Sequence, residues 1–298
     1  MTLLERLRAL RPGASNRTLR LLLDHGLVHV DGAPAKKAAA PVADRAKITI
    51  QSKPRAGVEA IPTVPIVFED SHVVVIDKPS NLRTVTPRGA KTEESAWSRL
   101  RKMLRARDRD SEVFLIHRLD RAASGLLVFA KSEKVKVSLK AALAKRDMER
   151  RYVAIVKGKP EQQEGEFRSG LLEDADPLHR VRSVKPRDPP GLRKVAREAV
   201  TRYRVLGEEK GLAAVEIRLE TGRKHQIRVH FAEAGHPLLG DRLYDGPPAD
   251  RLFLHAYTLG FAHPVTKAPM SFNSSIPEEF RSRLRKAFRA VEAQPRKG

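Results

Sequence analysis

The chain of 298 residues contains no cysteine. Disulfide bonds are therefore excluded, and so are zinc or iron–sulfur sites that depend on cysteine ligands. No apolar run approaches the ~20 residues that a membrane-spanning helix needs. The first ten residues, MTLLERLRAL, carry Glu5 and lack the apolar core of a signal peptide. We therefore expect a soluble monomer that acts in the cytoplasm and not at a membrane.

Acidic residues are scarce relative to basic ones. The chain has 36 Asp and Glu against 58 Lys and Arg, which gives a formal net charge of +22. Such a surplus indicates a polyanionic partner, because basic side chains that neutralise phosphates release bound counterions. A basic surface that serves only solubility is the alternative. Neither G-x-G-x-x-G nor a P-loop motif occurs, which argues against a nucleotide cofactor.

Residues 1–52 are predicted to form a small separate α+β unit. SNRTLRLLLDHG, residues 15–26, has the caps and apolar spacing of a helix, and LVHVDGAPAKK is typical of a strand and a turn. The combination resembles the S4 RNA-binding fold, in which Arg17 and Arg20 would contact RNA. An unrelated α+β module remains open as the alternative.

Residues 53–65, rich in proline, are predicted to be a linker, and residues 293–298 a frayed tail. In residues 66–292 strand often follows strand directly, which predicts an α+β domain with a mainly antiparallel sheet. Residues 159–195 carry Pro, Gly and many charges, so we expect a loop-rich basic insertion there.

Four further elements are predicted from periodicity. VFLIH and GLLVFAK are expected to be core strands, TGRKHQIRVHFAEAG a basic helix and SIPEEFRSRLRKAF one amphipathic helix.

The stretch HRLDRAASGLLVFAKS contains the most informative carboxylate of the chain, Asp120. A lone Asp after a strand is usually a turn residue or a helix cap. The flanking Arg118 and Arg121 favour an ionised carboxylate that could serve as a nucleophile or base. On spacing alone both interpretations stay open. Basic partners for this carboxylate could come from a segment about 100 residues downstream: Arg223, Lys224 and Arg228.

The histidines do not form a recognisable metal motif. His225 and His230 are five residues apart, which does not stack them on a helix face, and H-E-x-x-H is absent. We therefore predict no metal ion. Tyr152 opens the strand-like run RYVAIVKG, where a sheet aromatic and a catalytic tyrosine are equally compatible with the pattern.

Several motifs together resemble the RluA family of RNA pseudouridine synthases. In chain order they are HVVVIDKP, HRLDRAASGLLVFAKS, RRYVAIVKG, ETGRKHQIRVHFAEAGHPLLGDRLYDG and LFLHAYTLGF. The resemblance spans about residues 66–290. Two stretches depart from the family pattern, the residues after HRLD and the segment SNLRTVTPRG after DKP.

The resemblance implies the pseudouridine synthase α+β fold with an RNA cleft, and neither a metal nor a cofactor. Asp120 would be the essential aspartate, and Tyr152 the active-site tyrosine that packs on the uracil. Arg228 would pair with the aspartate, and Arg118 would help to flip the base. We expect His117, Arg121, Arg223 and Lys224 to contact RNA as well.

The reaction implied is the isomerisation of uridine after the base has been flipped out of its stack. Asp120 would either attack the nucleoside or remove a ribose proton to give a glycal, and the sequence does not choose between these routes. Large-subunit ribosomal RNA is the favoured substrate and transfer RNA the alternative. A non-catalytic RNA-binding or ribosome-assembly factor and a metal-dependent nuclease are the rival functions.

Overall fold

The computed structural model describes residues 1–10, 12, 16, 19, 22–23, 27–35, 37–43, 45–50, 63–86, 94–173 and 180–292. The chain divides into two compact units. The first comprises Met1–Thr63 and Lys102–Arg109, and the second Val64–Arg101 and Asp110–Gly298. The predictions for Arg17, Arg20, most of the 15–26 helix, the linker up to residue 62 and the tail lie outside the described residues.

The first unit combines a helix with a small antiparallel sheet. Its elements are α1 (Leu3–Leu10), β1 (Val28–Val30), β2 (Ala33–Pro34) and β3 (Ile48–Ile50), with the strand order β2-β1-β3. Asp31 and Gly32 both have positive φ, as the predicted tight turn of a hairpin requires. Leu3 and Leu7 of α1, a helix that the sequence analysis did not predict, lie in the same core as Leu19 and Leu23.

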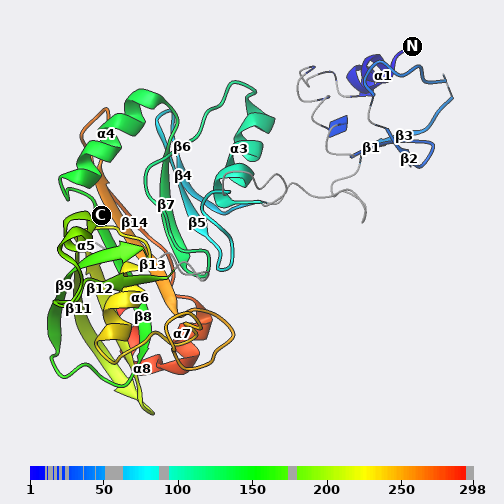
Figure 1. Cartoon of the computed structure of the whole chain (residues 1–298). Helices are drawn as coiled ribbons and strands as arrows, with labels where there is room; N and C mark the ends of the chain where they lie inside the picture. Colours follow the sequence, from blue (N-terminus) through cyan, green and yellow to red (C-terminus); the bar gives the residue numbers. More distant parts are fainter. Residues whose placement is uncertain are drawn as a thin grey trace. The chain divides into compact units, whose positions relative to one another are not determined.

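The second unit is built on one large mixed sheet (Figure 1). Its strands run in the order β10-β9-β11-β12-β8-β13-β7-β5-β4, with β14 paired to β13 and β6 to β7. In the described part of this sheet, every pairing except β7 with β13 is antiparallel, as predicted. The strands are β4 (Ile66–Glu69), β5 (Val73–Lys78), β6 (Phe114–Leu115), β7 (Ser124–Ala130), β8 (Glu149–Lys157), β9 (Glu164–Glu173), β10 (Val181–Ser183), β11 (Arg197–Glu209), β12 (Leu212–Leu219), β13 (Leu254–Ala262) and β14 (Pro269–Asn273).

The described helices of the second unit are α4 (Glu133–Ala144), α5 (Pro190–Val195), α6 (Gln226–Glu233), α7 (Glu278–Arg283) and α8 (Arg285–Glu292), and α3 (Ala96–Arg107) has residues in both units. α4 contacts β7, α6 contacts β10 and β11, and α8 contacts β11. Among the described residues, no helix is both long and apolar enough to cross a bilayer.

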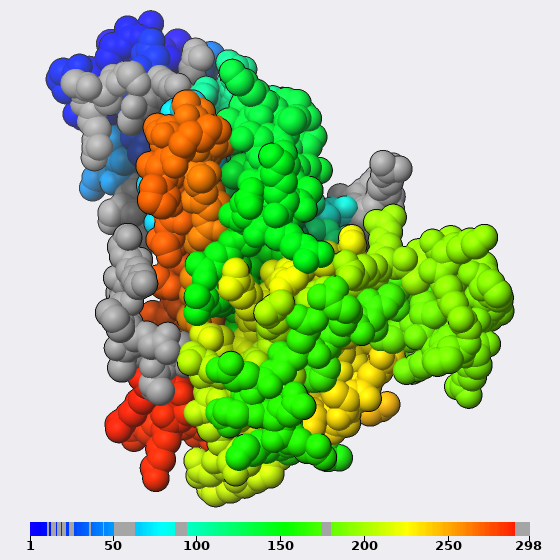
Figure 2. Space-filling model, turned by 90° about the vertical axis from the view of Figure 1, so that its left-hand side faces the viewer, coloured from blue at the N-terminus to red at the C-terminus, as the bar shows by residue number. Residues whose placement is uncertain are grey.

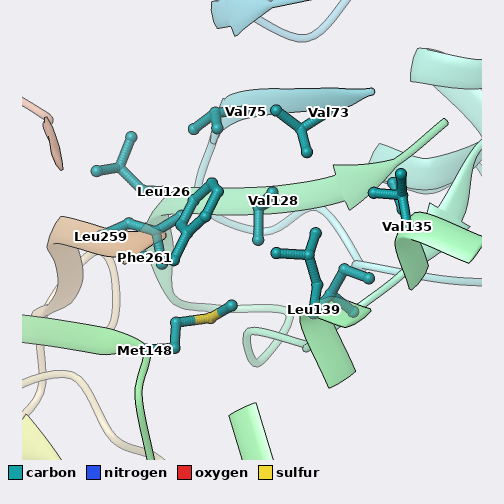
Figure 3. Packing of buried hydrophobic residues seen from close by; sticks show 11 residues of the cluster. Val73, Val75, Leu126, Val128, Val135, Leu139, Met148, Leu259 and Phe261 are labelled. Carbon is teal, nitrogen blue, oxygen red and sulfur yellow. The ribbon is translucent and has the colours of Figure 1, made fainter. Parts of the chain in front are cut away.

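Strand β7 is the centre of the core, because all seven of its residues are buried. Leu126 and Val128 pack with Val73 and Val75 of β5 and with Leu139 of α4, and Figure 3 shows these side chains converging. α4 begins at Ser132, whose hydroxyl accepts a hydrogen bond from the backbone N–H of Val135. The continuous apolar run of the sequence thus becomes a strand covered on both faces.

Gly125 allows β7 to begin beside β13. Its φ is 116°, and a Cβ at this position would lie 2.2 Å from the carbonyl oxygen of Ala256. The strand therefore starts at a fixed point, which also fixes the loop that precedes it.

Four predictions are corrected by the structure. Residues 159–195 are not mainly loop but contain β9, β10 and α5. Burial alternates along β9, as in a strand with one covered and one exposed face, and so its sequence lacks the apolar run of a core strand. In Figure 2 the light-green part of the chain that includes α5 projects from the second unit. The expected core strand VFLIH is reduced to the two residues of β6.

The predicted C-terminal helix is interrupted. α7 ends before Leu284, whose φ of −140° is not helical, and α8 follows. Phe280, Leu284 and Phe288 are nevertheless all buried in one cluster, so the apolar spacing was read correctly although the backbone breaks. The helix in TGRKHQIRVHFAEAG likewise starts only at Gln226, which leaves Arg223 and Lys224 in the preceding turn.

Candidate active site

A cavity of about 680 Å³ lies in the second unit. Its walls come from the loop before β7, the start of β8, the end of β12 and the segment that leads into α6. We call the buried and part-buried polar side chains His117, Asp120, Arg150, Tyr152 and Arg228 the cavity floor. We call the exposed Arg118 and Arg223, together with the part-buried Lys224, the rim.

Asp120 sits in a turn that the segment after β5 holds in place. The N–H of Ala123 donates to the carbonyl oxygen of Asp120 at 3.2 Å, so Asp120 is a turn residue as well as a cavity residue. Thr84 donates its hydroxyl to the carbonyl oxygen of Leu119 and accepts from the Leu119 N–H, at 2.8 and 3.1 Å. Ser80 donates to the carbonyl oxygen of Ala122 at 2.8 Å. The backbone on both sides of Asp120 is therefore fixed.

Lys78 reinforces the same turn from inside. Its side chain is fully buried, and Nζ lies within hydrogen-bond distance of the carbonyl oxygens of Pro79, Leu82, Arg121 and Ala123, at 2.9, 2.8, 3.3 and 2.5 Å. Burial lowers the pKa of Lys78 to about 7, and the charge of Asp120 opposes this shift. A buried ammonium thus joins the end of β5 to the turn that carries Asp120.

Arg228 connects Asp120 to a second, fully buried carboxylate. Its Nε and Nη2 donate to the two oxygens of Asp241 at 2.7 and 2.8 Å, and Nη1 donates to Oδ2 of Asp120 at 3.3 Å. Burial alone would lower the pKa of Arg228, but the hydrogen bonds and charges of the two carboxylates outweigh it and raise the pKa. The planar fork on Asp241 therefore aims the remaining Nη1 at Asp120.

Tyr244 supports this arrangement. Its ring lies 5.1 Å from the Arg228 guanidinium, and its hydroxyl lies 3.1 Å from Nδ1 of His225. The hydroxyl also accepts from the N–H of Val181 at 2.9 Å. Burial raises the pKa of Tyr244 to about 12, so the phenol stays protonated at neutral pH. Strand β10 is thereby tied to the residue that stacks on Arg228.

α6 is held by polar side chains that are buried but satisfied. Gln226 donates to the carbonyl oxygen of Val200 at 3.0 Å and accepts from the hydroxyl of Thr221 at 2.7 Å. His230 lies 2.9 Å from both the Thr201 and the Ser169 hydroxyls. These bonds explain why the HQIR segment docks on the sheet, and they place Arg228 at the cavity.

Tyr152 and His117 complete the floor. Tyr152 is buried on β8, and burial raises its pKa, so that it is a phenol at neutral pH. Burial, together with the charge of Arg150, lowers the pKa of His117 to about 3. His117 was predicted to contact RNA, and it would do so as a neutral imidazole. Among the described residues, no three His, Asp or Glu side chains are grouped so as to hold a metal ion.

The predicted rim residues differ in their exposure and in the hydrogen bonds and ion pairs that they form. Arg118 is exposed, and Arg223 donates from Nε to the carbonyl oxygen of Glu198 at 3.0 Å. Lys224 pairs with Glu173 at 3.1 Å. Arg121 is exposed and donates to the carbonyl oxygen of Asn81, but it does not line the cavity. The structure thus brings together every described site residue of the sequence analysis except Arg121.

Sequence reasoning missed Lys78, Arg150 and Asp241. All three stand in motifs that had been noticed, and two carried a readable signal. Lys78 is a charge at the end of an apolar strand, which suggests a buried and paired side chain. Arg150 stands two residues before Tyr152 on the same strand and therefore shares its face. Asp241 lies 13 residues beyond Arg228, and no pattern in the sequence around either residue indicates that they pair.

Comparison with known proteins identifies what this chain is similar to. The family model described as RNA pseudouridylate synthase matches residues 72–233. The dual-specificity RNA pseudouridine synthase RluA of Vibrio cholerae serotype O1 is 37% identical over 209 residues, which cover 68% of this chain and 79% of the relative. The ribosomal large subunit pseudouridine synthase D of Xanthomonas campestris pv. campestris is 34% identical over 270 residues, which cover 83% and 76%.

Solved structures of RNA pseudouridylate synthase domains have a fold similar to that of this chain. The human RNA pseudouridylate synthase domain containing 4 superposes with a TM-score of 0.59 at 25% identity, and the match covers 75% of this chain and 93% of that one. The human domain containing 1, at 20% identity, has the same TM-score and supports the fold alone.

Proposed function

This chain belongs to the RluA family of RNA pseudouridine synthases, and we propose that it isomerises uridines of large-subunit ribosomal RNA with Asp120 as the catalytic carboxylate. The observation that carries the role of Asp120 is its hydrogen bond from Arg228, whose other donors are fixed on the buried Asp241. A carboxylate held in this way at a cavity meets the geometric need of a nucleophile or base.

The other site residues take complementary roles in this proposal. Tyr152 packs its ring against the flipped uracil, and its protonated hydroxyl is available for proton transfer. Arg228 orients Asp120. Arg118 enters the gap left by the flipped base, because it is exposed beside Asp120. The remaining predicted contacts hold the phosphates on either side: Arg121, Arg223, Lys224, and in the S4-like first unit Arg17 and Arg20.

The proposed substrate rests on the relatives. The Xanthomonas protein is named for the ribosomal large subunit and the Vibrio protein for a dual specificity. Large-subunit ribosomal RNA is therefore the first candidate, and transfer RNA is the second. The protein would act as a monomer in the cytoplasm, where both RNAs are found.

The test is to map pseudouridine in ribosomal and transfer RNA from cells that lack this protein. We expect at least one large-subunit position to stay uridine, to be restored by the wild-type protein and to remain unmodified with Asp120→Asn. Loss of a transfer-RNA position alone would favour the second substrate. An unchanged map in both RNAs would contradict the proposal.

A further inference from the structure

Arg150 is a buried cation on the cavity floor for which the described part of the chain provides no carboxylate partner. Its Nη2 donates to the carbonyl oxygens of Leu219 and Thr221 over long distances of 3.4 and 3.5 Å. Its buried Nε has no hydrogen-bond partner among the described residues. Desolvating a cation without a paired charge is unfavourable. Stability therefore does not explain why this position carries an arginine.

The surrounding backbone fixes this guanidinium beside Tyr152. Arg150 and Tyr152 occupy alternate positions of β8, so both project from the same face of the strand, and both line the cavity. On the other side, a Cβ added to Gly222 would lie 2.8 Å from Nη1 of Arg150. The glycine lets the segment after β12 close against the guanidinium, which keeps its position defined.

The donors of the other buried cations near the cavity are already committed. Arg228 uses Nε and Nη2 for Asp241 and Nη1 for Asp120. Lys78 Nζ is surrounded by four carbonyl oxygens, which take up its N–H donors. His117 is neutral at physiological pH, since burial and the charge of Arg150 lower its pKa. Arg150 is thus the floor cation with donors left for a ligand.

The isomerisation creates a transient need for such a cation. When the N1–C1′ bond breaks, the electron pair stays on N1, and the uracil anion spreads its charge over N1, O2 and O4. C1′ meanwhile bonds to an Asp120 oxygen, or the C2′ proton passes to Asp120 and leaves a glycal. Later C5 bonds to C1′: in the covalent route the bond between C1′ and the Asp120 oxygen breaks and its electron pair returns to the carboxylate, and in the glycal route C2′ regains its proton from Asp120. The C5 proton is then lost, and N1 gains a proton. The ring is negative only between these two events.

We propose that Arg150 donates hydrogen bonds to a uracil carbonyl and stabilises the negative charge that the detached ring carries. This inference rests on the proposed function and adds a catalytic residue to it. A preorganised charge in a site shielded from water stabilises an anion strongly. Because the charge develops only after the ground state, Arg150 acts on the rate of the chemical step more than on RNA affinity.

The test varies the leaving group and the arginine together. Two RNAs carry uridine or 5-fluorouridine at the target position, and the fluorine stabilises the uracil anion without help from the protein. We expect Arg150→Gln to slow single-turnover cleavage of the N1–C1′ bond by about 10²- to 10³-fold on the uridine RNA. On the 5-fluorouridine RNA the loss is smaller by about tenfold, and the Kd of both RNAs stays within about threefold of wild type.

The digested RNA is analysed by liquid chromatography coupled to mass spectrometry, because the N1-linked nucleoside and its C5-linked isomer have the same mass and must be separated before they are quantified. Arg218→Gln, an exposed arginine of β12, is the matched control and retains wild-type rates on both RNAs. Arg150→Lys keeps the charge and shows a smaller loss than Arg150→Gln. If Arg150→Gln fails to fold, the ratio of the two substrates measured with Arg150→Lys decides instead.

An equal loss of rate on both RNAs would overturn the inference, and so would a loss that appears only as weaker RNA binding. The latter would make Arg150 a phosphate contact. A wild-type protein that converts neither RNA would instead contradict the proposed function itself, so the two failures are distinguishable.

Discussion

The floor and the rim of the cavity both carry basic side chains, but these differ in burial and in the hydrogen bonds that hold them. On the floor, Arg228 is buried, and its hydrogen bonds join it to Asp241 and Asp120. On the rim, the side chains of Arg118 and Arg223 are exposed to solvent. We therefore propose that the fixed geometry of the floor serves the chemistry, whereas the rim contacts the RNA around the flipped base.

The largest loss of activity is expected from the floor carboxylate. Asp120→Asn keeps the size and shape of the side chain but removes the charge that a nucleophile or base requires. We expect the single-turnover rate of pseudouridine formation to fall by more than about 10³-fold. Asp250→Asn, an exposed aspartate beyond the cavity, is the matched control and should retain full activity. Equal rates for the two variants would remove Asp120 from the mechanism.

The next effect concerns the fold as well as the rate. Arg228→Met leaves Asp241 buried without its partner, and we expect the free energy of unfolding to drop by about 3–5 kcal/mol. Urea denaturation measures this drop. The double variant Arg228→Met/Asp241→Leu removes both charges and should recover much of the stability while staying inactive. A double variant no more stable than the single one would show that the buried pair is not the cause.

A pH-dependent difference is expected from Lys78. Its pKa is lowered to about 7 in the folded chain and has its ordinary value of 10.5 when unfolded. Between these values the unfolded chain binds more protons, so this group makes stability rise as pH increases from 7 to 10.5. Below pH 7 both states are protonated, and the full cost of burying the ammonium is present.

Lys78→Met should therefore lack this rise. The free energies of unfolding of the wild type and of Lys78→Met are measured from pH 6 to pH 10. Above pH 7 the wild type should gain stability relative to the variant. Lys134→Met, at an exposed position of α4, provides the control. Parallel pH profiles for wild type and Lys78→Met would be incompatible with a charge that is lost in the folded state.

The smallest effect belongs to the rim. Arg223→Ala should weaken RNA binding uniformly among sequences and reduce the slope of log Kd against log salt concentration by about 1. The maximal rate at saturating RNA should be unchanged, because Arg223 is exposed and does not contact Asp120 in the structure. Fluorescence anisotropy over a salt series makes the measurement. A lower maximal rate with an unchanged salt slope would move Arg223 from the rim to the floor.

The sequence predicted those parts of the molecule whose cause is local. The apolar run GLLVFAK is such a local pattern, and the structure confirms that it forms a buried strand. Asp120, Tyr152 and Arg228 were found because each stands in a long motif, and they do line one cavity.

What the sequence could not show depends on residues that meet only after folding. The segment SNLRTVTPRG looked like a mere departure from the family pattern, but Ser80 and Thr84 bind the turn that carries Asp120. The fork of Arg228 on Asp241 likewise needs the turn after α6 to bring the carboxylate back. The break at Leu284 is invisible in a periodicity that both helices together satisfy.

One experiment tests most directly whether the floor determines the reaction rate and the rim the affinity for RNA. Single-turnover rates at saturating RNA and RNA dissociation constants are measured side by side for Asp120→Asn and for the double variant Arg118→Ala/Arg223→Ala. We expect Asp120→Asn to lose the rate and keep the affinity, and the rim variant to lose affinity by about tenfold or more. An Asp120→Asn protein that forms pseudouridine at a near-normal rate would contradict the account.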